Sequence, residues 1–202
     1  MTDEDEYFSW LISMRLREGH HPMENDGMQF DCVQQSIPYA GDAFDVRRDV
    51  YRTDDTDFSV EYLDTADAVT VLAFTTDGEV LVLEEWRYSV GRTDCGLPGG
   101  QLEPGDDGPA DAARRELREE TGYEAGSLES LGAFEPLNSL LTTRIYYFAA
   151  HDCQQTDEPD PDVDEQIRVD TRSLAALRDA VCDGAITDTR TAFAVLYASS
   201  FL

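Results

Sequence analysis

Apolar and polar residues alternate in several short stretches of this chain, a pattern typical of half-buried β-strands. The predicted strands are residues 43–52, 57–63, 68–75, 79–88, 127–137, 143–151 and 167–169. The first two flank a Thr-Asp-Asp-Thr turn and predict a small N-terminal sheet. An Asp-Gly pair at residues 77 and 78 joins the next two as a hairpin, because these residues favour tight hairpin turns.

A second pattern, with apolar residues three or four positions apart, predicts helices. It predicts a short helix at residues 7–17 and two closing helices at residues 171–184 and 186–202. Another helix ends at Gly122 and carries an apolar stripe of Ala110, Ala113 and Leu117. The acidic, proline-containing residues 152–166 predict an exposed loop before the last strand.

The helix before Gly122 carries an unusual group of acids. Glu116, Glu119 and Glu120 sit at offsets 0, 3 and 4, so they share one helical face. Like charges at this spacing repel one another, and a hard divalent cation such as Mg²⁺ would compensate them. The alternative is a solvated acidic helix in an acidic protein.

The sequence around these acids resembles the Nudix box of the Nudix hydrolases, G-x5-E-x7-R-E-U-x-E-E-x-G-U, where U is a bulky apolar residue. Residues 115–123 match its second half in full, and Gly100 matches its first glycine. The first half departs from the pattern, because the acidic position falls on Asp106 with eight residues before Arg115. Asp107 is the alternative acidic position, with the insertion lying earlier.

The resemblance implies an α/β fold: a Nudix α/β/α sandwich with a mixed sheet over residues 66–202. Residues 1–65 would form an extension with a helix and a small β-sheet. The implied cofactor is Mg²⁺, or Mn²⁺ in its place, and Arg115 would orient Glu119. The implied metal ligands are the Gly99 carbonyl, Glu116, Glu119 and Glu120.

A second passage, residues 84–100, resembles the "QYR…ELPAG" segment of ADP-ribose pyrophosphatases and related nucleoside-diphosphate-sugar pyrophosphatases. In that subgroup the arginine matching Arg87 contacts substrate, although an ordinary surface ion pair is an equal alternative for Arg87. Gly96 and Gly99 stand where the subgroup has Glu and Ala. The N-terminal sheet before the passage suggests a homodimer.

The resemblance implies Mg²⁺-dependent hydrolysis of a nucleoside diphosphate linked to another group. ADP-ribose, which would give AMP and ribose 5-phosphate, is the favoured substrate. Glu165, before the last predicted strand, matches a loop glutamate of the subgroup and is the expected general base, with Asp164 as the alternative. Two other functions stay open: a ligand-sensing module without hydrolysis, and hydrolysis of nucleoside triphosphates or dinucleoside polyphosphates.

Composition narrows the choice of partners. Acidic residues outnumber basic ones 43 to 15, giving a net charge of -28, and every basic residue other than histidine is arginine. Such a surface opposes nucleic-acid binding. A small nucleotide as partner is what the Nudix resemblance implies. The charge and the absence of lysine favour a halophilic source, because salt would screen the repulsion.

The sequence shows no pattern typical of a signal peptide, a membrane span or a zinc site. The N-terminus lacks the basic start and apolar run of a signal peptide, and no run of 18 apolar residues predicts a membrane span, so a cytoplasmic protein is expected. The four cysteines have no Cys-x-x-Cys spacing, which opposes a zinc site. His20 and His21 have no accompanying ligand spacing and are expected to be exposed.

Overall fold

The computed structural model describes residues 30–161 and 166–200. The predicted helix at 7–17, both adjacent histidines and the candidate base Glu165 lie outside the described residues. The chain divides into two compact units, Met1–Leu63 and Asp64–Leu202. As a division into functional domains, the boundary between residues 65 and 66 stays a prediction.

The first unit holds a three-stranded sheet in the order β1 (Asp31–Ala40), β2 (Asp45–Arg52), β3 (Asp57–Asp64). β2 and β3 lie where alternation predicts strands. β1 was missed because its pattern is irregular: it pairs antiparallel with β2 through two register shifts, each of which changes the residues facing one side.

This small sheet carries both aromatic rings and charged pairs. The ring of Phe58 contacts those of Phe30 and Tyr51, with centroids 5.3 and 5.8 Å apart. Phe30 and Phe58 nevertheless remain 47% and 36% exposed. Charged pairs such as Arg52 and Asp57, 2.8 Å apart, also decorate the sheet. The sheet therefore presents partly exposed aromatic rings.

The second unit is built on a seven-stranded mixed sheet. β4 runs parallel to β9, β9 pairs antiparallel with β8 and β7, and β5 pairs antiparallel with β10 and β6. A hairpin joins β4 to β5 through the pairing of Phe74 with Val80. The strands are β4 (Ala68–Thr75), β5 (Val80–Arg87), β6 (Arg92–Gly96), β7 (Tyr123–Glu124), β8 (Ser127–Phe134), β9 (Ile145–Gln155) and β10 (Ile167–Arg172).

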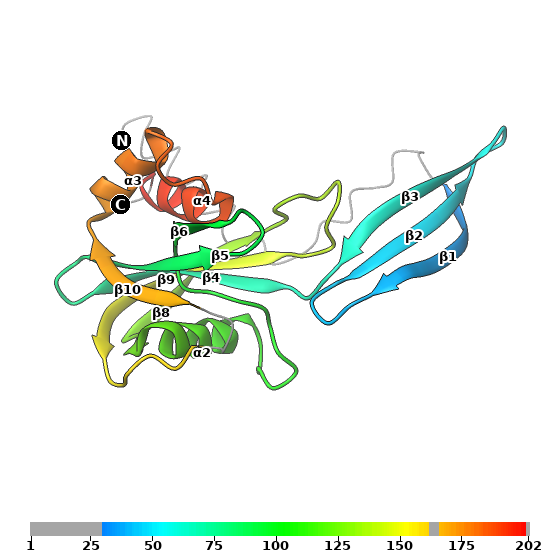
Figure 1. Ribbon diagram of the computed structural model, residues 1–202. Helices are drawn as coiled ribbons and strands as arrows, with labels where there is room; N and C mark the ends of the chain where they lie inside the picture. The colour runs from blue at the N-terminus through cyan, green and yellow to red at the C-terminus, as the bar shows by residue number, and fades with distance from the viewer. Residues whose placement is uncertain (1–29, 162–165, 201–202) are drawn as a thin grey trace, which may run out of the picture. The chain divides into compact units, whose positions relative to one another are not determined.

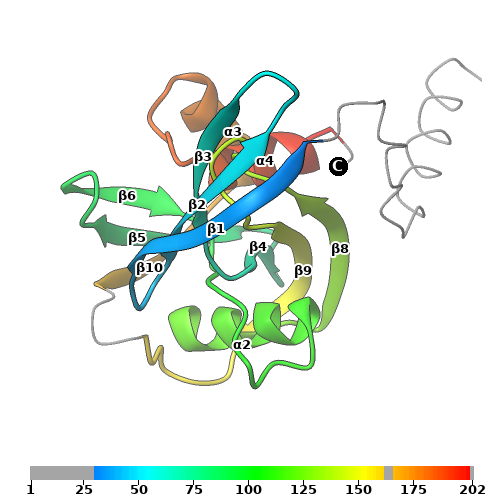
Figure 2. The ribbon, with the colours of Figure 1, turned by 90° about the vertical axis from the view of Figure 1, so that its right-hand side faces the viewer.

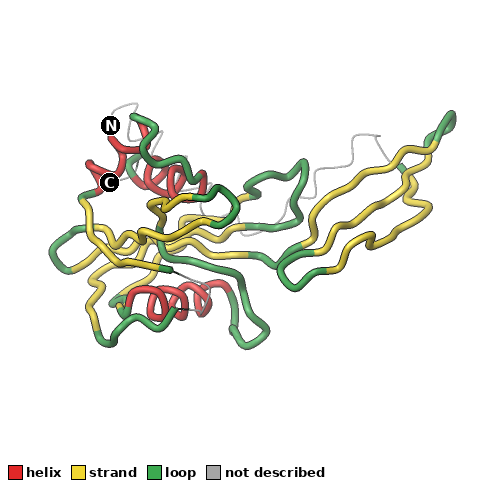
Figure 3. Tube along the Cα trace, viewed as in Figure 1, coloured by secondary structure: helices red, strands yellow, loops and turns green. Residues whose placement is uncertain are grey.

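Helices cover both faces of this sheet. α2 (Pro109–Thr121) packs on one face, and α3 (Leu174–Cys182) and α4 (Thr189–Ala198) pack on the other (Figures 1 and 2). The same three layers are visible when strands and helices are coloured separately (Figure 3). The predicted α/β/α sandwich with a mixed sheet and a small N-terminal sheet is confirmed.

Alternation along the central strand explains why two helical layers are needed. Val69 and Val71 of β4 pack in the cluster beneath α2, whereas Leu72 packs in the cluster beneath α3 and α4. All three are fully buried. A strand buried on both faces needs apolar cover on each side, so α2 is fixed against β4 by its own apolar residues.

Two local predictions were wrong. Ala110 is exposed, and α2 instead packs Ala112, Ala113 and Leu117 in the core cluster beneath it. The predicted loop after residue 151 begins later, because β9 continues to Gln155 through a pairing with β7.

Candidate active site

Helix α2 has sequence-encoded ends. Pro109 occupies its first turn, where the missing N–H is not needed, and Gly122 ends it in the left-handed region with φ 74°. The Gly122 amide donates to the Arg118 carbonyl at 2.7 Å. These limits place Glu116, Glu119 and Glu120 in the last turns of the helix.

The glycine turn lies directly against these glutamates. The Gly99 amide donates to Glu120 Oε2 at 2.7 Å, and the Gly100 carbonyl accepts from the Val69 amide at 2.8 Å. A Cβ on Gly99, whose φ is 151°, would lie 2.2 Å from the Val69 carbonyl oxygen. A Cβ on Gly100 would lie 2.4 Å from Glu116 Oε1. Gly99 is therefore required where the turn meets the β4 backbone, and Gly100 lets the Glu116 carboxylate lie directly against the turn.

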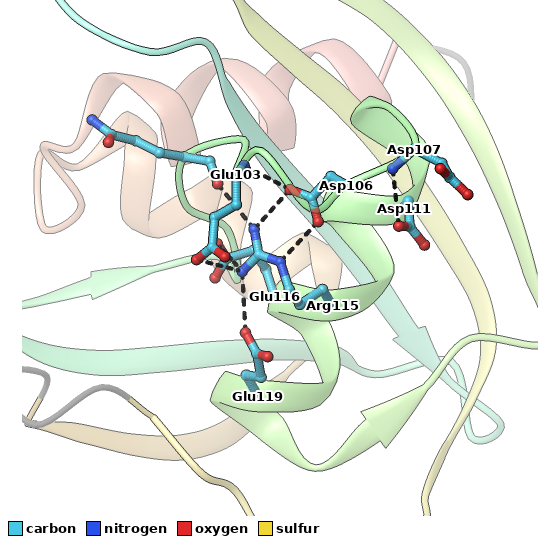
Figure 4. A network of polar contacts seen from close by, with 8 residues as sticks. Glu103, Asp106, Asp107, Asp111, Arg115, Glu116 and Glu119 are labelled. Carbon is cyan, nitrogen blue, oxygen red and sulfur yellow. Dashed lines mark hydrogen bonds and ion pairs between the residues drawn. The ribbon is translucent and has the colours of Figure 1, made fainter.

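Arg115 gathers the surrounding carboxylates (Figure 4). Its Nε and Nη2 donate to the two oxygens of Asp106 at 3.0 and 3.1 Å, the bidentate geometry in which arginine binds carboxylates most strongly. Its Nη1 donates to Glu116 at 2.9 Å and to Glu119 at 3.1 Å. The expected contact between Arg115 and Glu119 is thus present, and it is one of several.

This network shifts the protonation equilibria of its members. The hydrogen bonds from Arg115, and then the Glu103 amide, hold the pKa of the Asp106 carboxyl below its usual value despite the opposing effect of burial. The Asp106 carboxylate in turn raises the pKa of Arg115. Of the two candidate acidic positions, Asp106 meets Arg115, whereas the Asp107 amide donates to Asp111.

Arg87 lies close to the same turn. Its Nη1 is 2.6 Å from Glu85 Oε1, and its Nη2 is 3.8 Å from where a Cβ on Gly96 would lie, three residues before Gly99. Glu85 is only 7% exposed and was missed at the sequence level. The signal was available, because residues two apart on a strand point to the same face.

The donor chemistry suits a hard divalent ion. Glu116 and Glu119 both accept hydrogen bonds from Arg115 Nη1, and Glu120 lies on the same helical face. Carboxylate oxygens of this kind are the ligands that a hard divalent ion prefers. Within residues 30–161 and 166–200, however, no three His, Cys, Asp or Glu side chains are grouped closely enough to hold a metal. Arg115 and the Gly99 amide are their partners in this arrangement.

A cavity of about 530 Å³ opens on the arginine side of α2, lined by Arg114, Arg115 and Arg118 together with the 103–106 loop. Its lining includes neither Glu116 nor Glu120. It therefore does not mark the carboxylate face.

Comparison with known proteins identifies this arrangement. The NUDIX domain family matches residues 64–186, which include the glycine turn, α2 and all strands of the seven-stranded sheet. The chain belongs to the NUDIX domain family. The predicted assignment to the Nudix pyrophosphohydrolases is thereby confirmed.

Individual proteins also resemble this chain. The chain is 33% identical over 131 residues to an ADP-ribose pyrophosphatase of Bacillus subtilis, covering 64% of this chain and 70% of that protein. It is 30% identical over 131 residues, with the same coverage, to a methanol dehydrogenase activator of Bacillus methanolicus. The crystal structure of an ADP compounds hydrolase shares the fold, with a TM-score of 0.76, 20% identity and coverage of 86% of this chain and 94% of that one.

The structure brings most of the predicted site residues together. Gly99, Arg115, Glu116, Glu119 and Glu120 meet at the turn and α2, and Arg87 lies beside Gly96. Nudix hydrolases generally use divalent metal ions, which suits this donor set. Along the part of the chain that the structure describes, no helix is long and apolar enough to span a membrane.

Proposed function

We propose that this Nudix protein hydrolyses a nucleoside diphosphate linked to another group, with ADP-ribose as substrate and AMP and ribose 5-phosphate as products. The observation that carries the proposal is the seating of Glu120 on the Gly99 amide beside Glu116 and Glu119. Two ADP-ribose pyrophosphatases among the relatives, from Bacillus subtilis and Mycobacterium tuberculosis, support the substrate. The second is 29% identical over 103 residues, half of each chain.

The proposed metal site lies between the glycine turn and α2. Glu116, Glu119, Glu120 and the Gly99 carbonyl would hold Mg²⁺, or Mn²⁺ in its place. When bound, the ion supplies positive charge that offsets the phosphate charge and makes a water more acidic. Arg115 keeps Glu116 and Glu119 oriented and ties the 101–106 loop to α2, since its Nη2 also donates to the Gln101 carbonyl at 3.0 Å.

Arg87 is proposed to bind a phosphate of the substrate. It is held at 2.6 Å by Glu85, which fixes the direction of its guanidinium, while 35% of its side chain stays exposed. Guanidinium groups match phosphate oxygens in geometry and charge. The ion pair and the substrate contact are therefore compatible, because one nitrogen serves Glu85 and the others remain available for phosphate.

Glu165 is proposed as the general base. Metal-bound carboxylates are poor proton acceptors, so the base should come from outside the three helical glutamates. Glu165→Gln should lower kcat by about 10²- to 10⁴-fold with little change in KM. Asp164→Asn is the matched control; if only that variant is impaired, the base is Asp164, and if both are fully active, the base lies elsewhere.

The partly exposed rings Phe30 and Phe58 support a homodimer built on the N-terminal sheet, because exposed apolar patches mark protein contacts. Phe58→Asp should convert a dimer to a monomer in light scattering. A wild-type protein that is monomeric at micromolar concentration would remove this proposal.

The activity itself is tested by product analysis. The protein is incubated with ADP-ribose, other nucleotide sugars, dinucleoside polyphosphates and nucleoside triphosphates, with Mg²⁺, with Mn²⁺ or with a chelator, and products are separated chromatographically. We expect AMP and ribose 5-phosphate from ADP-ribose, and none with chelator. Faster cleavage of triphosphates would overturn the substrate, and binding of ADP-ribose without cleavage of any compound would identify a sensing module.

A further inference from the structure

The segment that forms the glycine turn is held by a different partner at each residue. The Leu97 amide donates to the Thr191 hydroxyl at 3.2 Å, and the Pro98 carbonyl accepts from the Val71 amide at 2.8 Å. The Gly99 amide donates to Glu120 at 2.7 Å. β4 and α2 thus fix the turn from one side, while Thr191 reaches it from α4, on the opposite layer (Figure 1).

Asp188 fixes the orientation of the Thr191 hydroxyl. Its hydrogen goes to Asp188 Oδ2 at 2.7 Å, so its oxygen is left as acceptor for the Leu97 amide. The same Asp188 oxygen caps α4 by accepting from the Thr191 amide at 3.0 Å. Burial raises the pKa of the Asp188 carboxyl, but Arg190 and Thr191 outweigh it and keep the pKa below its usual value. The acceptor therefore stays charged at neutral pH.

The contact between Thr191 and Leu97 is buried. Thr191 is 1% exposed, and Leu97, which it holds, is 6% exposed within the core cluster that includes Ala194 and Val195. A buried amide needs an acceptor, and the Thr191 hydroxyl supplies it to Leu97. A displaced Leu97 would shift Gly99 as well, because only Pro98 lies between them along the chain.

We propose that Thr191, oriented by Asp188, is a positioning residue for the active site: it sets the place of the Leu97–Gly100 turn, and through the Gly99 amide the orientation of Glu120. This inference rests on the proposed metal-dependent function of the Glu120 face. Groups that hydrogen-bond directly to a metal ligand, as the Gly99 amide does to Glu120, commonly govern metal affinity by about 10- to 100-fold, and Thr191 acts on this contact through the turn. Thr191, Gly99 and Glu120 lie far apart in sequence, so these contacts tie α4 to the site on α2.

The test compares variants that differ in one hydroxyl. Thr191→Val removes the acceptor with little change of shape, and Thr191→Ser keeps it. Ser199→Ala is the matched control, because Ser199 lies just past the same helix and its hydroxyl donates to the Val195 carbonyl at 2.6 Å rather than to the turn. Thr191→Ala replaces Thr191→Val if the valine variant fails to fold.

Two measurements are made without substrate. The first is amide hydrogen exchange of residues 96–101. The second is titration of the protein with Mn²⁺, in which electron paramagnetic resonance detects the free ion. In Thr191→Val, exchange at Leu97 and Gly99 should accelerate about 10-fold or more and Mn²⁺ should bind about 10-fold more weakly. Thr191→Ser and Ser199→Ala should match the wild type. In turnover, Thr191→Val should lower kcat more than it raises KM.

The inference is overturned if a folded Thr191→Val or Thr191→Ala protein has the same amide exchange rates at Leu97 and Gly99, or the same Mn²⁺ affinity, as the wild type. Equal losses in Ser199→Ala also overturn it, because α4 as a whole would then be responsible. The outcome is separable from the proposed function. If the wild type cleaves none of the nucleotides, the function fails, whereas the exchange and Mn²⁺ results still decide whether Thr191 positions the turn.

Discussion

Replacing Arg115 by methionine removes the cation from the centre of the carboxylate network while keeping a side chain of similar length. The guanidinium makes two contacts with Asp106 and one each with Glu116 and Glu119. The side chains of Asp106 and Glu116 are only 5% and 12% exposed, whereas that of Glu119 is 41% exposed. Solvent can therefore replace the arginine at Glu119 but not at the other two.

These exposures set the expected cost. Removing one partner from a buried ion pair costs about 3–5 kcal/mol, because a charge is left without compensation. An exposed i,i+4 pair such as that with Glu119 contributes only about 0.3–0.5 kcal/mol. In the variant, Asp106 still accepts a hydrogen bond from the Glu103 amide at 2.7 Å, which reduces the loss of stability. We expect Arg115→Met to lower the free energy of unfolding by about 3 kcal/mol in metal-free buffer at neutral pH.

The loss should also depend on pH. The pKa of Asp106 is lowered in the folded protein, so its contribution to stability is present above its ordinary value, about 4, and disappears as the pH falls through the lower folded value. The difference between wild type and Arg115→Met should therefore narrow on acidification below about pH 4.

The assay is urea denaturation of wild type, Arg115→Met, Arg115→Lys and Arg118→Met with chelator present. Lysine keeps the charge without the bidentate geometry, so its loss should be intermediate. Arg118 is an exposed arginine of the same helix that forms no ion pair with the described residues, so Arg118→Met should cost less than about 1 kcal/mol. An equally small loss for Arg115→Met would refute the account of a buried network.

Three further predictions concern the acids, the turn and the charge. Glu120→Gln should abolish most metal-dependent turnover while the protein stays folded, because an amide oxygen still accepts the Gly99 amide but binds a hard cation poorly; full activity at unchanged Mg²⁺ demand would contradict this. Gly99→Ala should destabilise the protein by about 1–3 kcal/mol or more in urea denaturation, because its Cβ would lie 2.2 Å from the Val69 carbonyl oxygen at φ 151°, and a wild-type midpoint would disprove the close approach. Molar KCl should raise the melting temperature relative to dilute buffer, since a net charge of -28 is self-repelling until screened; a flat or falling melting temperature would remove the halophilic interpretation.

Local sequence determined the elements that need only neighbours along the chain. The glutamate spacing at 116, 119 and 120, the proline at 109 and the glycine at 122 define α2 and its acidic face, because helical geometry and helix ends depend on residues a few positions apart. Alternation likewise located β4, β5 and β8 to within a few residues. The irregular strand β1 and the short polar strand β6 were missed, because their pairing comes from partners rather than from their own pattern.

Only the tertiary structure decided how distant segments meet at the site. The choice of Asp106 over Asp107 depends on how the 103–106 loop folds back onto Arg115. The contact of Thr191 with Leu97 spans 94 residues, and no periodicity reports such a pairing. The sequence predicts that Gly99 is a turn residue. Only the structure shows why a glycine is needed there, because a Cβ would collide with the Val69 carbonyl oxygen of β4. Long-range contacts arise from packing the three layers together, so their partners become visible only once the sheet and both helical layers are in place.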